Sequence, residues 1–268
     1  MKFDVPRLPS LTDKKVVHLQ CHIGTDTLSL SRLGASHVAG LDLSPASLLE
    51  ARKLASATAG SGGEKLAFVE GDVYAAPELL GRGQWDVVFT GIGALGWLPD
   101  IKRWAETVCA LLRPGGGELF IREGHPVLLA VGDTDPSKLV VEYPYFETAE
   151  PIVSEEPSTY VRLEMEGKTF EARKTVEWNH GLGEIVGALL GVGMRVTMLE
   201  EHRSVPWNAL PGQMVSVGDG ELLLQRWRSV GVALLTHDCR RVGAGDREGS
   251  IAAVVYSTGC QRIKMGGY

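Results

Sequence analysis

From residue 15 to residue 121, short apolar runs alternate with longer segments of helical periodicity. This alternation is typical of successive strand–helix–strand units, which build a parallel sheet. We expect five strands, at residues 16–19, 37–41, 66–70, 85–89 and 118–121. The fourth run is apolar on both sides, so we place it at the centre of the sheet, covered by helices on both faces.

Helical patterns follow three of these strands. Thr25 or Asp26 is expected to cap the first helix, because short polar side chains satisfy free amides at a helix start. Ser44–Pro45 begins the second helix, since proline is tolerated in the first turn. A third helix is expected over residues 101–112, ended by an Arg-Pro-Gly-Gly turn. The pattern therefore predicts an α/β fold.

The alternation of strand and helix patterns ends after Pro126, where a segment rich in Glu, Pro and Tyr extends to about Asn179. It predicts an inserted lid of irregular strands that borders a substrate. Further on we expect a helix over 182–190, a strand over 194–199, a helix over 221–235 and a last strand over 251–256. The expected divisions are a sheet core at 1–126, a lid at 127–180, and a C-terminal part of the core with an atypical tail at 181–268.

Composition narrows the class of protein. With 268 residues and 44% apolar content, the chain can bury one large core. The net charge of −6 and the scattered basic residues argue against a nucleic-acid partner. The four cysteines form no C-x-x-C pair, which is typical of reduced thiols in the cytosol. No signal peptide and no apolar run of about 18 residues is present, so we expect a cytoplasmic protein without a membrane partner.

Acidic residues follow the second and third predicted strands. Asp42 stands 22 positions after Gln20, where the first turn begins, and Asp72 occupies the matching place in the next unit. Ligands of open α/β sheets bind at the carboxyl ends of the strands. A carboxylate there can accept hydrogen bonds from ribose hydroxyls or from an adenine amino group, and Leu43 and Val73 would contact the base. Either acid alone would also fit as a helix or turn cap, but together they indicate a nucleoside.

Several segments together resemble one enzyme family. Residues 16–27 read VVHLQCHIGTDT, similar to the first motif of a class I S-adenosylmethionine-dependent methyltransferase branch, HLQCHxGxDT. The later motifs of that branch resemble GLDLSP at 40–45, GDV at 71–73 and WDVVFTGIGAL at 85–95. LRPGG at 112–116 and REGHP at 122–126 match what usually follows.

This resemblance implies a Rossmann-like sheet of seven strands, the last antiparallel, and direct in-line methyl transfer from S-adenosylmethionine to a small-molecule acceptor, on oxygen or nitrogen. The expected cofactor-binding residues are Gln20, Cys21, His22, Gly24, Asp42, Leu43, Asp72, Val73, Thr90, Gly91 and Ile92. Most class I enzymes have an acid at the position of His18 and glycines at those of Gln20 and His22, so only Gly24 remains of the usual glycines.

The candidate catalytic groups are Glu123 and His125, which follow the fifth predicted strand. Either side chain can take a proton from an acceptor. A structural turn explains them equally well. Trp178 and His180 are candidates for the wall of the substrate site, and a purely structural role explains them equally well. The aromatic residues at 143, 145 and 146 suit a small core of the lid better than a substrate site.

Three alternatives remain beside this interpretation. His18, Cys21 and His22 are all metal-ligand types, but no fourth ligand stands at a diagnostic spacing, so we expect no metal. A nicotinamide-dependent oxidoreductase would need a G-x-G-x-x-G turn, and residues 20–24 lack it. A catalytically impaired paralogue that still binds the cofactor is suggested by the short segment before Val16 and by the unusual tail. The oligomeric state is not predicted by the sequence.

Overall fold

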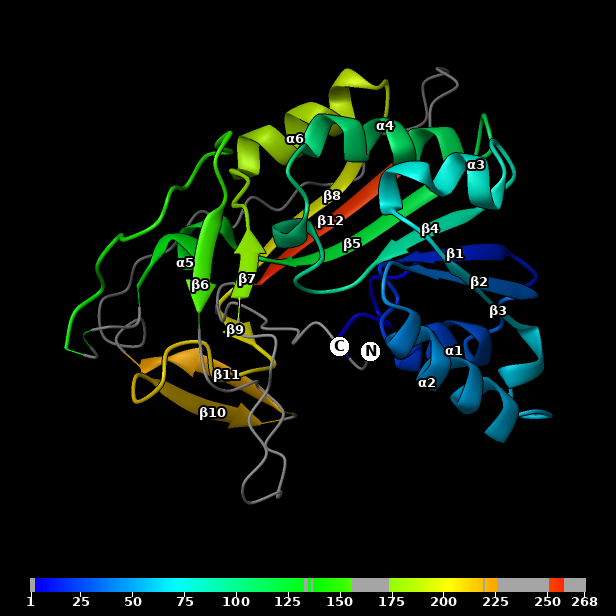
Figure 1. Ribbon diagram of the computed structural model, residues 1–268, viewed down its shortest axis with the longest axis horizontal. Helices are drawn as coiled ribbons and strands as arrows, with labels where there is room; N and C mark the ends of the chain where they lie inside the picture. The colour runs from blue at the N-terminus through cyan, green and yellow to red at the C-terminus, as the bar shows by residue number, and fades with distance from the viewer. Residues whose placement is uncertain are drawn as a thin grey trace.

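The computed structural model describes residues 3–132, 135, 137–155, 174–218 and 220–225, together with the backbone of 251–257. Its centre is a sheet with the strand order β3-β2-β1-β4-β5-β12-β8 (Figure 1). The five expected strands of the first half are β1 (Lys15–Leu19), β2 (His37–Asp42), β3 (Leu66–Glu70), β4 (Val87–Thr90) and β5 (Glu118–Gly124).

These five strands pair in parallel throughout, which confirms the predicted core. β4 lies between β1 and β5, and each of its residues is buried, as its apolar run predicts. β5 is longer than expected and extends to Gly124, so Glu123 belongs to the strand. Trp85 precedes β4 and makes only an isolated bridge with Leu112.

Two later strands continue the sheet beyond β5. β12 (Ile251–Ser257) pairs in parallel with β5 and with β8 (Arg195–His202). The expectation of an antiparallel last strand is therefore wrong. An antiparallel neighbour is usually joined by a short hairpin, whereas β9, β10 and β11 stand between β8 and β12 in the chain.

Helices cover both faces of the sheet (Figure 1). On one side lie α1 (Thr25–Arg32) and α2 (Pro45–Ala57). On the other lie α3 (Ala76–Leu80), α4 (Ile101–Leu111) and α6 (Leu182–Gly191). Single turns of 3-10 helix occur at η1 (Gly63–Lys65), η2 (Val73–Ala75) and η3 (Leu95–Trp97).

Local sequence explains most of the helix starts. Ser44 caps α2 and accepts a hydrogen bond from the Ser47 amide at 3.2 Å, as expected. The predicted cap of α1 at Thr25 or Asp26 is wrong, because Gly24 occupies that position with a φ of 77° and offers no side chain. A left-handed residue is needed there to turn the chain from β1 into α1, and glycine adopts that conformation without a steric penalty.

Alternation along the strands divides the core into two clusters. Ile121 of β5 packs with Trp104 and Leu111 of α4 in the larger cluster. Phe120, the neighbouring residue, packs with Phe89 and Leu30 on the opposite face, towards α1. Successive side chains of a strand point to opposite faces. It follows that Arg122 continues the Phe120 side and Glu123 continues the Ile121 side.

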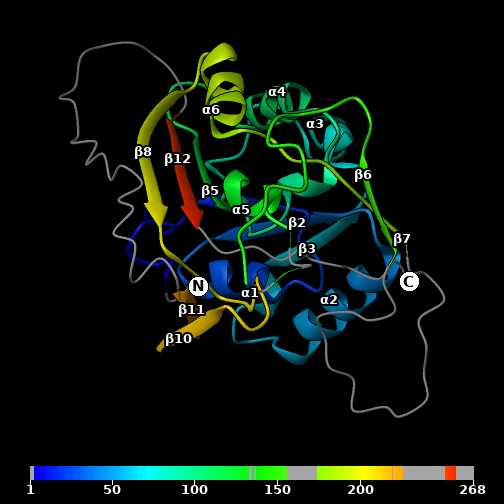
Figure 2. The ribbon, with the colours of Figure 1, turned by 90° about the vertical axis from the view of Figure 1, so that its left-hand side faces the viewer.

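The segment after β5 begins with α5 (Pro126–Ala130) and contains β6 (Ile152–Glu155) paired antiparallel with β7 (Lys174–Glu177). Figure 2 shows this pair beside the sheet rather than within it. Asn179 donates through Nδ2 to the carbonyl oxygens of Pro126 and Pro144, both at 2.9 Å, and so joins the two ends of the segment. A lid function for this segment stays a prediction.

A small separate sheet has the order β10-β11-β9, from β9 (Ser204–Val205), β10 (Met214–Gly218) and β11 (Glu221–Leu224). The helix expected from residue 221 is wrong for 221–224, since β11 pairs antiparallel with both neighbours. Gly218 and Gly220 have positive φ angles and form the turn that a hairpin requires. Residues 226–235 lie outside the described residues. Among the described helices, none is long and apolar enough to cross a membrane.

Candidate functional site

The turn after β1 adopts an unusual backbone conformation. Gln20 and His22 have φ angles of 55° and 50°, and Gly24 has 77°. Non-glycine residues rarely occupy this left-handed region, because Cβ crowds the backbone there. Glycine adopts such angles without a steric penalty, so Gln20 and His22 occupy positions that suit glycine.

Asp42, the last residue of β2, holds this turn from the neighbouring strand. Its Oδ2 accepts a hydrogen bond from the His22 amide at 2.7 Å, and its Oδ1 accepts one from the Ser44 amide at 2.9 Å. The residue is half-buried. A carboxylate offers about four acceptor positions, so each oxygen keeps capacity for a further donor. The side chain can therefore shape the turn and still accept hydrogen bonds from a ligand diol.

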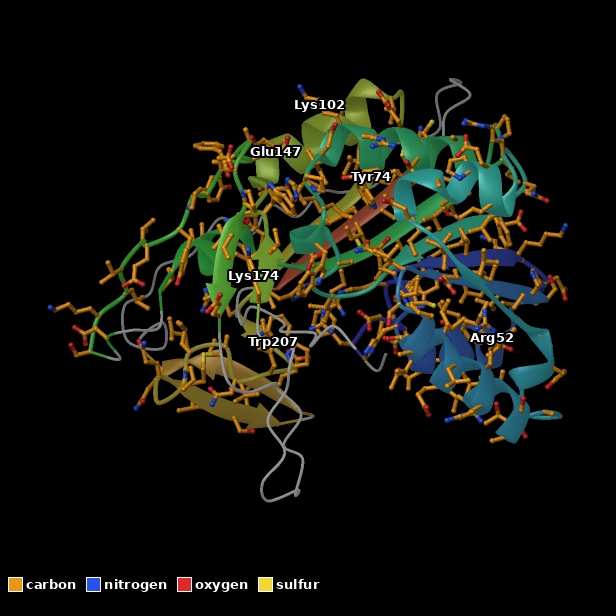
Figure 3. All side chains as sticks on the ribbon, in the orientation of Figure 1. Arg52, Tyr74, Lys102, Glu147, Lys174 and Trp207 are labelled. Carbon is orange, nitrogen blue, oxygen red and sulfur yellow. The ribbon has the colours of Figure 1, made fainter. Side chains whose placement is uncertain are left out.

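Asp72 lies at the same edge of the sheet as Asp42. β2 and β3 are parallel neighbours, and the Gly71 amide donates to the Asp42 carbonyl oxygen at 3.0 Å. Asp72 is exposed, and only its Oδ1 is engaged within the described residues, by the Tyr74 amide at 2.8 Å. Figure 3 shows Tyr74, whose hydroxyl donates to the Asp100 carbonyl at 3.0 Å and so ties this turn to α4.

The two apolar residues beside these acids differ in exposure. Leu43 is 70% exposed, whereas Val73 is 5% exposed and belongs to the larger core cluster. A leucine this exposed next to a strand end contributes little to the fold. It offers an apolar surface that a base can cover, whereas Val73 offers at most one edge of its side chain.

Gln20 connects the first turn with the loop after β4. Its Nε2 donates to the Ala94 carbonyl oxygen at 2.9 Å, while its Oε1 is buried without a hydrogen-bond partner among the described residues. Thr90, at the end of β4, has a buried Oγ1 in the same condition. Buried polar atoms without partners are costly, and a ligand bound at this edge would supply a hydrogen-bond donor to the Gln20 Oε1.

The side chains of Cys21 and His18 are buried within the fold. The Cys21 side chain packs beneath β2, where a Cβ on Gly40 would lie 2.8 Å from its Sγ. Burial, with a smaller contribution from Asp42, raises the pKa of the Cys21 thiol to about 12. His18 Nδ1 lies 2.9 Å from Thr27 Oγ1, and burial lowers the pKa of this imidazole to about 4. Within the described residues, no group of three His, Cys, Asp or Glu side chains could hold a metal ion.

Glu123 is 2% exposed, and both of its carboxylate oxygens accept hydrogen bonds from backbone amides. Oε1 accepts from Gly93 and, at 2.8 Å, from Gly124, and Oε2 accepts from Leu95 at 2.9 Å. Burial raises the pKa of this carboxyl to about 7, and these amides oppose the shift. Glu123 thus holds the loop after β4 in place.

His125 also has both ring nitrogens engaged. Nδ1 accepts from the Val127 amide at 3.2 Å, which makes His125 the cap of α5. Nε2 lies 2.5 Å from Glu201 Oε1, and with Nδ1 acting as an acceptor the proton of the neutral ring sits on Nε2. Burial lowers the pKa of His125, and Glu201 opposes the shift. The polar atoms of both candidates for proton transfer, Glu123 and His125, are therefore already engaged in hydrogen bonds within the protein.

The other two candidates lie against the same loop. The Trp178 amide donates to the Gly96 carbonyl at 2.8 Å, and the His180 Nε2 donates to the carbonyls of Leu98 and Leu95 at 2.8 and 3.1 Å. Glu147, seen next to α6 in Figure 3, places its Oε2 2.9 Å from His180 Nδ1. The loop after β4 is thus held from several sides.

The aromatic pair of the predicted lid packs on itself. The rings of Tyr145 and Phe146 meet edge to face with centroids 4.9 Å apart. The Tyr145 hydroxyl oxygen accepts from the Leu182 amide at 3.2 Å, at the start of α6. Phe146 is 64% exposed, however, so the expectation that these aromatics form a small core is not met by this pair.

A cavity of about 560 Å³ lies next to the predicted cofactor residues Gly91 and Ile92. It is bounded also by Asp26 of α1, Arg122 of β5 and Glu221 of β11. The three-stranded sheet that contributes Glu221 lies on the α1 side of the central sheet (Figures 1 and 2). Asp42 and Asp72 do not line this cavity, so it adjoins the two acids without coinciding with them.

Apart from Gly91 and Ile92, the residues that line this cavity were not identified from the sequence. Phe3, Asp4, Arg122 and Glu221 all line it, yet none was a candidate. The signal for Arg122 was present, because a lone arginine in an apolar parallel strand is unusual. Phe3, Asp4 and Glu221 are far from the motifs in sequence and carry no local signal.

Comparisons with known proteins agree with this geometry. Residues 16–116 match a family model described as a methyltransferase domain. An assigned S-adenosylmethionine-dependent methyltransferase from Listeria monocytogenes is 19% identical, with a TM-score of 0.53 over 71% of this chain and 78% of that one. Another from Mesorhizobium loti is 21% identical, with a TM-score of 0.47 over 72% of this chain and 79% of that one. No curated protein matches the sequence.

The domain match makes the protein an enzyme with a methyltransferase domain over residues 16–116. The similarity to the Listeria structure shows the α/β Rossmann-like fold. The residues at the carboxyl edge fit S-adenosylmethionine, the cofactor that the sequence motifs imply. The carboxylates of Asp42 and Asp72 retain acceptor capacity for hydroxyl and amino donors, Leu43 offers exposed apolar surface, and the Gln20 Oε1 lacks a donor.

Proposed function

We propose that this enzyme transfers a methyl group to a small-molecule acceptor, on oxygen or nitrogen, by direct in-line attack. The observation that carries the proposal is the adjacency of the acidic edge to the cavity. Asp42 ends β2 and Asp72 follows the neighbouring strand β3, while Gly91, which follows β4, lines the 560 Å³ cavity. A volume of this size suits a small metabolite, since such pockets usually enclose about 300–1,000 Å³.

In this proposal the first three turns bind the cofactor. Asp42 accepts from the ribose hydroxyls, Asp72 accepts from the adenine amino group through its available oxygen, and Leu43 covers one face of the base. Gln20, His22 and Gly24 line the methionine part, and Thr90, Gly91 and Ile92 border it beside the cavity. Cys21 contributes its backbone alone, because its thiol is buried beneath β2.

Bound S-adenosylmethionine supplies an electrophilic methyl group, and the chain's own residues supply position. Holding two reactants in line replaces a bimolecular encounter and removes much of its entropic cost. Glu123, Gln20 and His180 fix the loop after β4, whose first residues separate the cofactor edge from the cavity. Glu123 and His125 are positioning residues in this proposal, because their polar atoms already serve the backbone and Glu201.

The segment at 127–180 is proposed to border the acceptor as a lid, with the core at 1–126 and 181–268. Asn179 supports this arrangement, because it joins both ends of the segment next to α5. We also propose that the protein acts without nucleic acid, on account of its net charge of −6.

Two measurements test the proposed function. Titration calorimetry should detect S-adenosylmethionine binding and no NADH binding, and the reverse result would exclude the methyltransferase interpretation in favour of an oxidoreductase. A screen of small-molecule extracts with methyl-labelled cofactor should yield a labelled small product. If the cofactor binds and neither small-molecule nor macromolecular fractions become labelled, the protein is an impaired paralogue.

A further inference from the structure

The cavity beside Gly91 carries an unbalanced charge. Its described lining includes the carboxylates of Asp4, Asp26 and Glu221 and a single guanidinium, that of Arg122. Among the described lining residues, carboxylates therefore outnumber cationic groups by two. In a partly enclosed space such an excess is screened less than on the open surface.

Arg122 does not offer its charge to a ligand. The residue is 3% exposed, and its guanidinium carbon lies 3.8 Å above the ring centroid of Phe3. Its Nη2 lies 3.1 Å from Glu221 Oε1, and its Nη1 lies 3.7 Å from Asp4 Oδ1. Two carboxylates therefore already neutralise this arginine, which argues against an anionic ligand.

Glu221 has one oxygen left over. Its Oε1 pairs with Arg122, while its Oε2 is buried without a hydrogen-bond partner among the described residues. Asp26 lies in the first turn of α1, on another wall of the same cavity. Arg7, which also stacks on the Phe3 ring, is paired with Glu200 at 2.6 Å and adds no uncompensated positive charge.

We infer that this cavity is the acceptor pocket and that it takes a small molecule bearing an ammonium group, held by Glu221 and Asp26. The inference rests on the proposed function, since the cavity serves an acceptor only if the neighbouring edge binds the cofactor. An ammonium ion supplies the positive charge that the described part of the lining lacks, and a protonated amine also supplies a donor for Glu221 Oε2.

Three probes of the same shape and different charge test this inference. Choline is the cation, 3,3-dimethylbutan-1-ol is its neutral isostere, and 3,3-dimethylbutanoate is an anion of similar shape. Calorimetry with the full chain and saturating S-adenosylhomocysteine should show choline binding about tenfold more tightly than the neutral probe, with the anion weakest. Equal binding of the three, binding of none, or preference for the alcohol or the acid would overturn the inference.

Variants then assign the selectivity to the cavity. Glu221→Gln and Asp26→Asn should each lower choline affinity several-fold and leave the affinity for the alcohol unchanged. Glu50→Gln is the matched control, because Glu50 is exposed on α2 and pairs with Lys53. Thermal melting reports whether each variant folds, and Asp26→Asn retains a test if Glu221→Gln does not. Choline selectivity that survives in both folded variants would overturn the assignment.

Failure of this inference is distinguishable from failure of the proposed function. Wild-type protein that binds S-adenosylmethionine but prefers the neutral or anionic probe refutes the ammonium pocket alone. Wild-type protein that does not bind S-adenosylmethionine refutes the proposed function itself.

Discussion

The carboxylate of Asp42 accepts a hydrogen bond from the backbone amide of His22 at 2.7 Å, so the end of β2 holds the left-handed turn after β1. One side chain thereby sets the shape of a turn on the neighbouring strand and presents its remaining acceptor positions at the edge of the sheet. Substitutions at this edge can therefore change the stability of the turn, the affinity for the cofactor, or both.

Replacing Asp42 by Ala should weaken S-adenosylmethionine binding by about 1–3 kcal/mol, because the acceptor for two hydroxyl donors is lost. Calorimetry measures the affinity, and chemical denaturation measures the stability that is lost with the His22 and Ser44 contacts. Glu50→Gln, which changes an exposed carboxylate on α2, should leave both values unchanged. An Asp42→Ala protein that folds and binds the cofactor normally would remove Asp42 from the site.

Replacing Leu43 by Ser should weaken cofactor binding by about 1 kcal/mol while the free energy of unfolding changes little. Leu43 is 70% exposed, so its apolar area is buried only when a base covers it. Leu49→Ser is the control, because Leu49 is 53% exposed on α2 and lies outside the proposed site. Equal cofactor affinity of the two variants would show that Leu43 does not contact the base.

Replacing Gly24 by Ala should destabilise the fold by about 1–3 kcal/mol. The residue has a φ of 77°, and an added Cβ would lie 2.9 Å from the Phe68 ring and 3.0 Å from Ala51. Gly187→Ala is the matched control, because this glycine lies inside α6 with nothing described within 4 Å of an added Cβ. That control should be neutral or stabilising, since alanine favours a helix. Denaturant unfolding measures the free energy of unfolding of both variants, and equal values would contradict the prediction.

Replacing Glu123 by Gln should destabilise the protein, with a cost that depends on pH. The pKa of Glu123 is raised from 4.5 to about 7 in the fold, so the folded state retains a proton that the unfolded state releases. Wild-type stability from this group is therefore fully present below pH 4.5 and falls as the pH rises towards 7. Glutamine does not titrate, so the cost of the variant should be larger at about pH 5 than at about pH 8.

The control for this substitution is Glu106→Gln, which alters an exposed residue of α4. Its effect on the free energy of unfolding should be small and nearly independent of pH. A cost of Glu123→Gln that grows between about pH 5 and about pH 8 would show that the amides of Gly93, Leu95 and Gly124 keep the carboxylate ionised, contrary to the expected direction.

Local sequence determined the core of the sheet and its acidic edge. The apolar runs of β1 to β5 and the Ser44–Pro45 helix start depend on neighbours along the chain, which a pattern contains. Parallel pairing then requires that residues following β2 and β3 meet at one edge, so the order of residues is enough to place Asp42 and Asp72 together.

Tertiary structure alone decided what surrounds that edge. Glu221 begins a strand rather than a helix because β11, which it starts, pairs with β10 and β9 on its two sides, and no local pattern contains those partners. Glu123 and Arg122 are adjacent in sequence, but one binds the loop after β4 and the other lines the cavity, because a strand sends neighbours to opposite faces. Long-range packing brings Phe3 and Glu221 to Arg122. This packing forms the cavity and determines which charged groups line it.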